Sequence, residues 1–392
     1  MKIVVLGGAG AMGRVVVMDL AESRDVHRIV IADANVKAAQ QLAAGLNDQR
    51  ISVAEIDASE SVHLDPLLGD AEVVANCLHH DFHLRVMESA WRTGTHYLDL
   101  GGLFWITQQQ LKLNDEWARK GLTAVSGMGS SPGTTNVMAG FAVEQFLDKV
   151  DSVHVRFAAV SLKKAGRRAL TLPYHISTVL DEFTARPPVF QNGEMIFVDP
   201  LSGEEEIPFP EPIGKARFMY SIHSEVATFP LSFKAKGIRN VSFKIALPPA
   251  LADKVRFLVD LGFAGTEKIP IEETEISPRE FLAAMYGRLP QDDVPPNDFG
   301  MIRVYVTGEW KGQKREIIME MGCGSGVKNW GVGSGALRTG IPPSIVAQML
   351  AKGEIAQRGV LPAEQCVPAK VFFRELAKRG MTVTSTVKEA RV

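Results

Sequence analysis

Cysteine is scarce in this sequence: Cys77, Cys323 and Cys366 are its three thiols in 392 residues. They lie far apart and without paired spacing, so neither a disulfide framework nor a cysteine-based zinc site is indicated. An excess of charge of either sign is also missing, because 43 Lys and Arg residues balance 45 Asp and Glu residues to a net charge of -2. This balance gives no reason to expect a nucleic acid or an anionic membrane as a partner.

Long hydrophobic runs are absent too. The longest apolar stretches have the length of a strand and are interrupted by charge or glycine, so no segment is predicted to span a bilayer. The first strand signal begins at Lys2, with no leader segment before it, which favours a cytoplasmic location. What the chain does have is the composition of an ordinary globular protein, 46% hydrophobic and 22% charged, and a length that favours two or more domains.

A glycine-rich turn follows the first apolar run. The run Ile3 to Leu6 leads into Gly8-Ala9-Gly10-Ala11-Met12-Gly13, and residues with helical apolar spacing come next. Gly8 permits a tight turn, Gly10 lets a pyrophosphate approach the backbone, and Gly13 lets helix and strand pack closely. The N–H groups and the positive dipole end of the helix then face the phosphates. The motif predicts a dinucleotide-binding βαβ unit whose cofactor contacts include Gly8, Gly10, Ala11, Met12 and Gly13.

The second apolar run, Arg28 to Ala32, ends in Asp33. An acid at this distance from the glycines is typical of a residue that binds the ribose hydroxyls of the cofactor. No arginine follows Asp33 to receive a 2′-phosphate, so NAD is the favoured cofactor. Lys37 is close enough to keep NADP open.

Two domains are predicted from the change in strand pattern. Up to about residue 129, short β runs alternate with helical ones, which is typical of a doubly wound parallel sheet (α/β, Rossmann). From Asp151 onward the strands alternate faces, and hairpins are predicted at Asn192-Gly193 and at Trp310 to Gln313. We therefore expect a Rossmann domain of residues 1–129 and about 336–392, with C-terminal helices (343–352, 368–379) returning to it. An α+β domain with a largely antiparallel sheet, for substrate binding and dimerisation, should span 130–335.

Ligands of open α/β sheets bind beyond the carboxyl ends of the strands. Four further residues at these ends are candidate cofactor contacts: Asp57, Cys77, Leu78 and Asp99. Asp57 can equally be a turn residue. A later helix starts near Pro132, and its free N–H groups, including those of Gly133 and Thr134, are candidates for binding a substrate carboxylate. Ordinary capping by Ser130 or Ser131 is the alternative.

Several of these segments together resemble a known family, the saccharopine dehydrogenase-like oxidoreductases. The resemblance covers nearly the whole chain and is carried by the glycine motif, by Asn76-Cys77-Leu78-His79-His80-Asp81-Phe82-His83, by Arg92 to Gly102, by Pro132-Gly133 with Asn136, and by the segments Arg358 to Val360 and Glu375 to Gly380. The segment Asp99-Leu100-Gly101-Gly102 and the run from Tyr174 look most like the lysine 6-dehydrogenase branch.

This resemblance implies an NAD(P)-dependent enzyme that transfers hydride to or from an amine-bearing carbon of an amino acid. It favours oxidative deamination of lysine, and it implies a homodimer that acts on a small molecule. Saccharopine reductases carry an aspartate before the Pro-Gly pair, whereas this chain has Ser131. Saccharopine or carboxynorspermidine dehydrogenation is therefore the alternative rather than the first expectation.

Such chemistry needs a group that accepts a proton from the amine and activates water on the imine, and a neutral histidine suits both tasks. The candidates are His80 and His83 after the fourth strand, and Tyr174, His175 and His223 in the second domain, with Ser224 as a substrate contact. A packing, capping or surface role is the alternative for each. A metal site at His79, His80 and His83 is not expected, because adjacent strand residues point to opposite faces.

Three questions stay open at this level. Arg217 or Arg239 could bind a substrate carboxylate, and the spacing does not choose between them. Cys77 could serve as the nucleophile of an aldehyde dehydrogenase, although its neighbours do not resemble those enzymes. Ser131 in place of an acid leaves room for a non-catalytic dinucleotide sensor.

Overall fold

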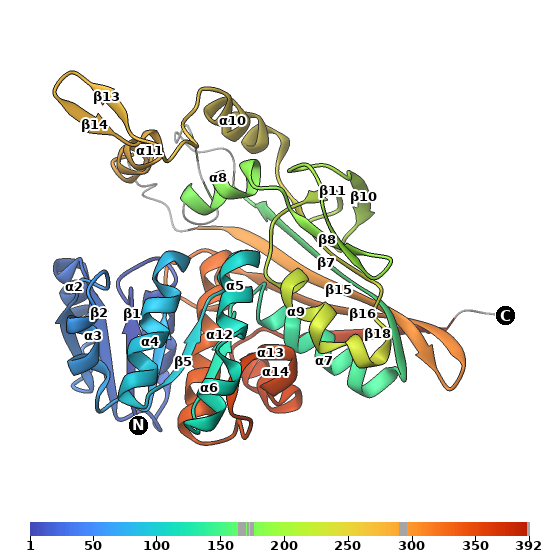
Figure 1. Ribbon diagram of the computed structural model, residues 1–392, viewed down its shortest axis with the longest axis horizontal. Helices are drawn as coiled ribbons and strands as arrows, with labels where there is room; N and C mark the ends of the chain where they lie inside the picture. Colours follow the sequence, from blue (N-terminus) through green and yellow to red (C-terminus); the bar gives the residue numbers. More distant parts are fainter. Residues whose placement is uncertain (164–169, 171, 173–175, 290–295, 390–392) are drawn as a thin grey trace.

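The computed structural model describes residues 1–163, 170, 172, 176–289 and 296–389, and it contains two large sheets (Figure 1). The first is a seven-stranded sheet in the order β17-β6-β5-β4-β1-β2-β3, in which all neighbouring strands are parallel. Its strands are β1 (Lys2–Leu6), β2 (Arg28–Asp33), β3 (Ile51–Glu55), β4 (Val73–Asn76), β5 (His96–Asp99), β6 (Thr123–Ser126) and β17 (Gly359–Pro362). The doubly wound parallel sheet is confirmed, and its strand order reverses between β1 and β4.

Helices on both faces bury this sheet. They are α1 (Gly13–Glu22), α2 (Val36–Leu46), α3 (Ser61–Leu68), α4 (His83–Thr93), α5 (Leu103–Leu111) and α6 (Asn114–Arg119), with a short 3-10 turn η1 (His80–Phe82) before α4. Strands β1 and β4 are buried along their whole length, which explains why they are continuous apolar runs. Local capping helps to place α2: the Asn35 side chain accepts a hydrogen bond from the Ala38 N–H at 3.1 Å.

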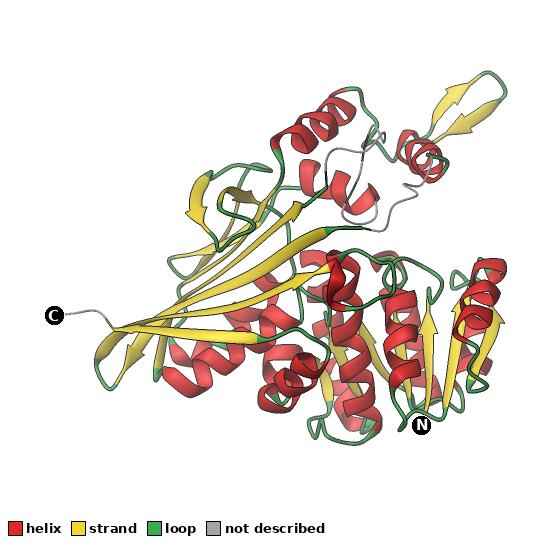
Figure 2. Cartoon of the chain, turned by 180° about the vertical axis from the view of Figure 1, so that it is seen from behind, coloured by secondary structure: helices red, strands yellow, loops and turns green. Residues whose placement is uncertain are grey.

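The second sheet has nine strands and is largely antiparallel, with one parallel pair, β7 with β12. Its strands are β7 (Lys149–Ser161), β8 (Pro188–Gln191), β9 (Glu194–Phe197), β10 (Glu205–Pro208), β11 (Lys215–Tyr220), β12 (Asn240–Ala246), β15 (Asp298–Trp310), β16 (Gln313–Gly324) and β18 (Val383–Glu389). Both predicted hairpins form, β8–β9 around Asn192-Gly193 and β15–β16 around Lys311-Gly312. Figure 2 shows the long strands of this sheet from behind.

The remaining elements connect or cover the sheets. Helix α7 (Thr134–Phe146) leads from the first sheet to the second, and α9 (Glu225–Ser232) and η2 (Lys234–Lys236) precede β12. Helices α8 (Ile176–Thr184), α10 (Pro249–Asp260) and α11 (Pro278–Gly287) share a small apolar cluster, and the separate hairpin of β13 (Ile269–Ile271) and β14 (Thr274–Ile276) lies near them (Figure 1). No helix among the described residues is long and apolar enough to cross a membrane.

The C-terminal part differs from the expected division in two ways. Helix α12 (Ser334–Ala351) begins nine residues before the expected start at 343, because Pro342 and Pro343 lie inside the helix rather than at its beginning. After η3 (Ser325–Val327) and α12 the chain returns to the first sheet with β17, α13 (Ala363–Cys366) and α14 (Ala369–Lys378). Strand β18 then pairs with β16 of the second sheet, so residues after 382 do not belong with the first domain.

Candidate functional site

The glycine turn after β1 has the backbone that a dinucleotide requires. A Cβ on Gly13 would lie 2.1 Å from the carbonyl oxygen of Gly7, and one on Gly8 would lie 3.0 Å from both the Ile31 side chain and the Val5 carbonyl. A side chain at either position would displace the turn from the strand. On Gly10, whose backbone would face the pyrophosphate, a Cβ would have only the Gly7 oxygen near it, at 3.1 Å. Ala11 and Met12 complete the turn directly before α1. The residues of this turn therefore fit a bound dinucleotide.

Asp33 stands at the end of β2 beside this turn. Its Oδ2 accepts a hydrogen bond from the Ala9 N–H at 2.9 Å, and its Oδ1 accepts one from the Asn35 N–H at 2.9 Å. These bonds hold the carboxylate at the edge of the turn, where the hydroxyls of a bound ribose would be expected. Asp57, by contrast, is exposed and accepts from the Ser59 N–H at 2.8 Å in a turn. Hydrogen bonding by the Ser59 side chain, followed by that N–H, lowers the pKa of Asp57.

Cys77 and Leu78 lie against the glycine turn from the end of β4. A Cβ on Gly7 would lie 3.1 Å from the Cys77 carbonyl oxygen and 3.1 Å from the Leu78 side chain. Burial, with a smaller contribution from Asp99, raises the pKa of the Cys77 thiol to about 12. Because a nucleophilic cysteine must be a thiolate near neutral pH, this environment does not favour Cys77 as the nucleophile of an aldehyde dehydrogenase.

Asp99 is completely buried and ties the ends of β5 and β6 together. Its Oδ1 accepts from the N–H groups of Gly101 and Gly127, both at 2.8 Å, and its Oδ2 accepts from Tyr97 at 2.9 Å and Gln110 at 2.6 Å. The prediction that Asp99 contacts the cofactor is therefore wrong as regards the carboxylate, which has no exposed surface. Its task is to shape the loops that follow both strands.

His83 and His80 are placed differently. His83 is 1% exposed, its Nδ1 lies 3.4 Å from Asp99 Oδ2, and burial lowers its pKa. Its Nδ1 faces the buried Asp99 carboxylate, an arrangement that supports a structural role for His83 rather than that of general base. His80 is half-buried in η1 against the ring of His79, and burial followed by the neighbouring His79 lowers its pKa to about 4. His79, His80 and Asp81 bring three ligand atoms within 4.8 Å of one another, but they are consecutive residues and Asp81 is exposed.

The start of α7 is already saturated with hydrogen bonds. The N–H of Gly133 donates to the Asn136 side chain at 2.8 Å, that of Thr134 to the Gly129 carbonyl at 3.0 Å, and that of Thr135 to the Ser130 carbonyl at 3.2 Å. The prediction that Gly133 and Thr134 offer free N–H groups to a carboxylate is wrong. The Asn136 side chain of the helix itself takes the Gly133 N–H, and the loop before the helix folds back to take that of Thr134.

Beside this helix start, a carboxylate and an imidazole from the second domain form a buried pair. Glu225 is completely buried; its Oε1 accepts from Ser131 and, at 2.8 Å, from Thr135, while its Oε2 is bonded to Nδ1 of His223. Burial alone would raise the pKa of Glu225, but His223 and the Ser131 hydroxyl outweigh it and lower that pKa. The His223 ring stacks on Phe243 with centroids 3.8 Å apart.

This pair lies at the carboxyl ends of the first sheet's strands. A Cβ on Gly101, directly after β5, would lie 2.6 Å from Pro132 and 3.6 Å from the Ser224 hydroxyl. Ser224 itself is 3% exposed and serves as a packing residue at this contact. The structure thus brings His223 close to the strand ends, together with Glu225, which the sequence analysis missed. The one available signal was the spacing His223-Ser224-Glu225 at a helix start.

The other candidates do not gather here. Arg217 is exposed on β11 and paired with Glu204 at 3.0 Å, and Arg239 is exposed between η2 and β12. Tyr174 and His175 lie outside the described residues. Neither arginine is therefore placed to bind a carboxylate next to the His223–Glu225 pair.

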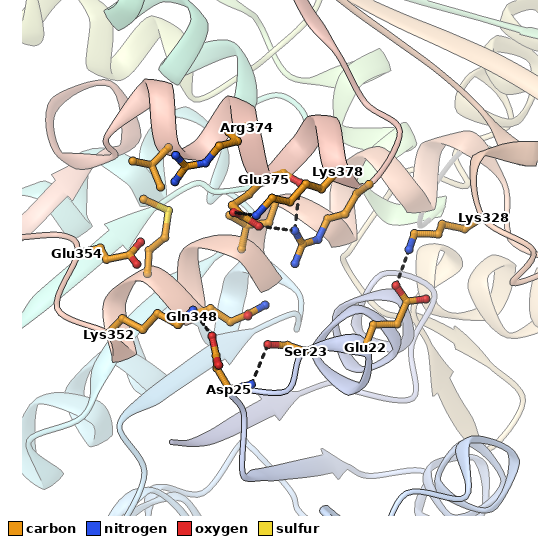
Figure 3. Close-up of a pocket in the computed structure, with 14 residues that line it drawn as sticks. Glu22, Ser23, Asp25, Lys328, Gln348, Lys352, Glu354, Arg374, Glu375 and Lys378 are labelled. Carbon is orange, nitrogen blue, oxygen red and sulfur yellow. Dashed lines mark hydrogen bonds and ion pairs between the residues drawn. The ribbon is translucent and has the colours of Figure 1, made fainter.

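A separate pocket of about 360 Å³ lies between the end of α1, α12 and α14 (Figure 3). Its charged side chains largely neutralise one another: Lys328 pairs with Glu22 and Lys352 with Asp25, both at 2.5 Å, and Lys378 pairs with Glu375 at 2.7 Å. Because α1 runs away from the glycine turn, this pocket is at the opposite end of the sheet from the cofactor site. We therefore assign this pocket no role in cofactor binding or hydride transfer.

Comparisons with known proteins bear on both domains. Residues 3–125 match the saccharopine dehydrogenase NADP binding domain, and residues 129–381 match the saccharopine dehydrogenase C-terminal domain. The chain belongs to the saccharopine dehydrogenase family. Like the members of this family, it is an NAD(P)-dependent oxidoreductase that acts on an amine-bearing carbon.

Two curated members of the saccharopine dehydrogenase family are similar in sequence. Carboxyaminopropylagmatine dehydrogenase of Synechocystis sp. is 24% identical over 96% of both chains. The NADP(+)-dependent, L-glutamate-forming saccharopine dehydrogenase of Saccharomyces cerevisiae is 29% identical over 39% of this chain and 31% of its own.

Two solved structures share the fold. The yeast saccharopine dehydrogenase (L-Glu forming) has a TM-score of 0.75 at 17% identity, covering 99% of both chains. The homospermidine synthase of Legionella pneumophila, solved with NAD, has a TM-score of 0.70 at 12% identity, covering 99% of this chain and 91% of its own.

Proposed function

We propose that this member of the saccharopine dehydrogenase family oxidises, or in reverse forms, the C–N bond of a secondary amine that carries a carboxylate. The relative from Synechocystis, which aligns over 96% of both chains, supports this class of substrate. Its name describes an agmatine extended by an aminopropyl arm with a carboxyl group. The yeast saccharopine dehydrogenase supports the same reaction type over a shorter alignment.

The observation that carries this proposal is the His223–Glu225 pair. Glu225 engages Nδ1 of His223, so Nε2 is the ring nitrogen left to exchange a proton with the substrate. When bound, NAD(P) accepts the hydride in the oxidative direction and supplies it in the reductive one. His223 would take the proton of the protonated amine before hydride transfer. It would then accept a proton from the water that adds to the imine carbon and return it to the nitrogen as the C–N bond breaks, which gives an aldehyde and a free amine.

Glu225 also bears on the substitution at Ser131. Saccharopine reductases carry an aspartate at that position, and here the Ser131 hydroxyl donates to Glu225 instead. A carboxylate supplied from α9 therefore stands next to the position where the resemblance expects one. This arrangement favours a working enzyme over a dinucleotide sensor that has lost its chemistry.

Lysine 6-dehydrogenation is the second candidate. It rests on the resemblance of Asp99-Leu100-Gly101-Gly102 to that branch, and the same His223–Glu225 pair would serve a primary amine. The two candidates differ in the substrates they require. A lysine dehydrogenase needs only lysine and the oxidised cofactor. The secondary-amine enzyme, assayed in the reductive direction, needs an aldehyde together with an amine.

The test is an assay of nicotinamide absorbance with NAD(H) and NADP(H). The oxidative direction would use lysine and saccharopine, and the reductive direction would use aspartate β-semialdehyde with agmatine or another diamine. Reduced cofactor consumed only when aldehyde and amine are both present supports the proposal, and oxidation of lysine alone supports the second candidate. Tight cofactor binding with no turnover of any amine would refute both.

A further inference from the structure

Arg338 on α12 is a buried cation with no carboxylate in ion-pair contact among the described residues, although the charge of Asp298 partly offsets the effect of burial on its pKa. Four cationic side chains are classed as buried in the structure: Lys2, Arg156, Lys244 and Arg338. Three of them have an acidic partner, since Lys2 pairs with Asp70 and both Arg156 and Lys244 pair with Glu205. Arg338, at 2% exposure, has no carboxylate oxygen within 4.0 Å among the residues that the structure describes.

Few of the guanidinium donors of Arg338 are used. NH1 donates to the Ser130 hydroxyl at 3.3 Å, and the buried Nε has no partner in the described part of the chain. The group stacks on the Phe157 ring, 4.7 Å from its centroid. A guanidinium offers five N–H donors, and leaving such a charge buried without an anion is costly.

The second sheet is shaped to admit this group. A Cβ on Gly300 of β15 would lie 2.3 Å from NH2 of Arg338, so a side chain at this position would displace the guanidinium. The nearby carboxylate of Asp298 is occupied elsewhere: it accepts from the Ser334 N–H at 3.0 Å and from the Ser334 hydroxyl at 2.8 Å, at the start of α12. Burial lowers the pKa of Arg338 to about 10, which leaves it a cation at neutral pH.

The position of Arg338 connects the two halves of the site. Its partner Ser130 directly precedes Ser131, which is bonded to Glu225. The next residue, Thr339, lies against Gly129, and Gly340 packs so closely on α1 that a Cβ there would be 2.8 Å from the Met12 carbonyl. Arg338 thus belongs to a segment of α12 that contacts both the loop before α7 and the first turn of the dinucleotide-binding helix.

We propose that Arg338 binds the carboxylate of the amine substrate, with the Ser130 hydroxyl beside it, while the amine faces His223. This inference rests on the proposed function and narrows it: the substrate must carry a carboxylate, and its decarboxylated analogue should be a poor substrate. A carboxylate matches the geometry of a guanidinium and would neutralise its buried charge. A phosphate of the cofactor offers the same chemistry, so the experiment has to separate the two sources.

The experiment compares Arg338→Met with wild type on lysine and on cadaverine, which is lysine without its carboxylate, or on the corresponding pair for whichever amine the wild type turns over. We expect the KM for the carboxylated substrate to rise about 100-fold. The KM for the decarboxylated analogue and the Kd for NADH should change less than twofold. Arg338→Lys keeps the positive charge but not the paired donors of the guanidinium. Its KM for the carboxylated substrate should therefore lie between those of wild type and Arg338→Met. Arg374→Met, an exposed arginine on α14, is the matched control.

A measurement without turnover accompanies this one. Millimolar glutarate, a dicarboxylate without an amine, should raise the Tm of wild type and leave that of Arg338→Met unchanged. If the wild type turns over no amine, the proposed function fails, and the glutarate response still tests Arg338. A rise in the Kd for NADH with substrate KM unchanged would assign the arginine to the cofactor and overturn the inference. If the KM values for both substrates rise equally in Arg338→Met, and glutarate does not raise the Tm of wild type, Arg338 has only a packing role. That result would also overturn the inference.

Discussion

The hydroxyl of Ser131 donates a hydrogen bond to Oε1 of Glu225, a residue 94 positions further along the chain. Ser131 lies in the loop between β6 and α7, and Glu225 begins α9, a helix that covers the second sheet. Through this bond and the adjacent His223, the second domain places a carboxylate and an imidazole near the carboxyl ends of β5 and β6. The proposed site therefore has a carboxylate beside the serine that stands where the resemblance expects an aspartate.

Replacing Glu225 by Gln should impair catalysis far more than cofactor binding. The amide removes the negative charge that orients His223, so kcat should fall roughly 100-fold or more, and the pH profile of kcat should shift. The Kd for NADH should stay within twofold of wild type. Steady-state kinetics over a pH series, with NADH fluorescence titration, measure both quantities.

Glu364→Gln provides a matched control for that variant. Glu364 accepts from Asn136 and from Ser232, both at 2.7 Å, but has no histidine partner. Its replacement should change stability with little effect on kcat. Equal losses of kcat in the two variants would argue against a special role for Glu225.

Cofactor preference should depend on Asp33. Asp33→Asn removes the carboxylate that would repel a 2′-phosphate, and it loses one of the two hydrogen bonds from the N–H groups of Ala9 and Asn35. The ratio of the Kd for NADH to that for NADPH should therefore rise about tenfold or more, equivalent to about 1.4 kcal/mol. Glu55→Gln is the control, because Glu55 is the exposed acid paired in register with Asp33 on β3. An unchanged ratio in Asp33→Asn would mean that the ribose is bound elsewhere.

Two glycine-to-alanine substitutions should have opposite effects on stability. In Gly13→Ala the new Cβ would collide with the Gly7 carbonyl at 2.1 Å, so the free energy of unfolding should drop by about 1–3 kcal/mol and cofactor binding should weaken. Gly45, inside α2, has no atom within 4 Å of the position of a Cβ. Gly45→Ala should therefore stabilise the protein by about 0.5–1 kcal/mol. Urea unfolding with and without NADH distinguishes the two; a Gly13→Ala protein with normal stability and affinity would contradict the close packing described above.

Acid should weaken the second domain through His154. Burial, aided by the nearby Arg156, lowers the pKa of this residue to about 4. The unfolded chain takes up the proton near pH 6.5 while the folded protein does not, so the stability contributed by neutral His154 is present above pH 6.5 and declines as the pH falls from there toward 4. Between pH 7.5 and 5 the loss should be roughly 2 kcal/mol. In His154→Gln, urea unfolding should show a correspondingly smaller pH dependence; the same dependence in both proteins would assign the effect to other groups.

The sequence by itself determined the first domain and the cofactor. The glycine motif, Asp33 and the alternation of apolar runs depend on contacts between neighbouring residues or adjacent strands, which leave a regular trace in the chain. The two hairpins could also be predicted, because Asn192-Gly193 and Lys311-Gly312 supply the backbone angles that such turns require. The start of α12 could not be predicted, because a proline pair usually marks the beginning of a helix, whereas Pro342 and Pro343 lie within this one.

Only the tertiary structure decided which polar residues are available. Asp99 and His83 have the residue types and strand-end positions of catalytic groups, yet both are buried and serve the loops around them. The N–H group of Gly133 is bonded to the Asn136 side chain of α7, and that of Thr134 to the Gly129 carbonyl of the preceding loop. Conversely, Arg338 carries no local motif, and Glu225 has only its spacing from His223 at a helix start. Their significance arises from burial beside Ser131 and Ser130, and burial of a charge is a property of packing between distant segments that no spacing in the sequence encodes.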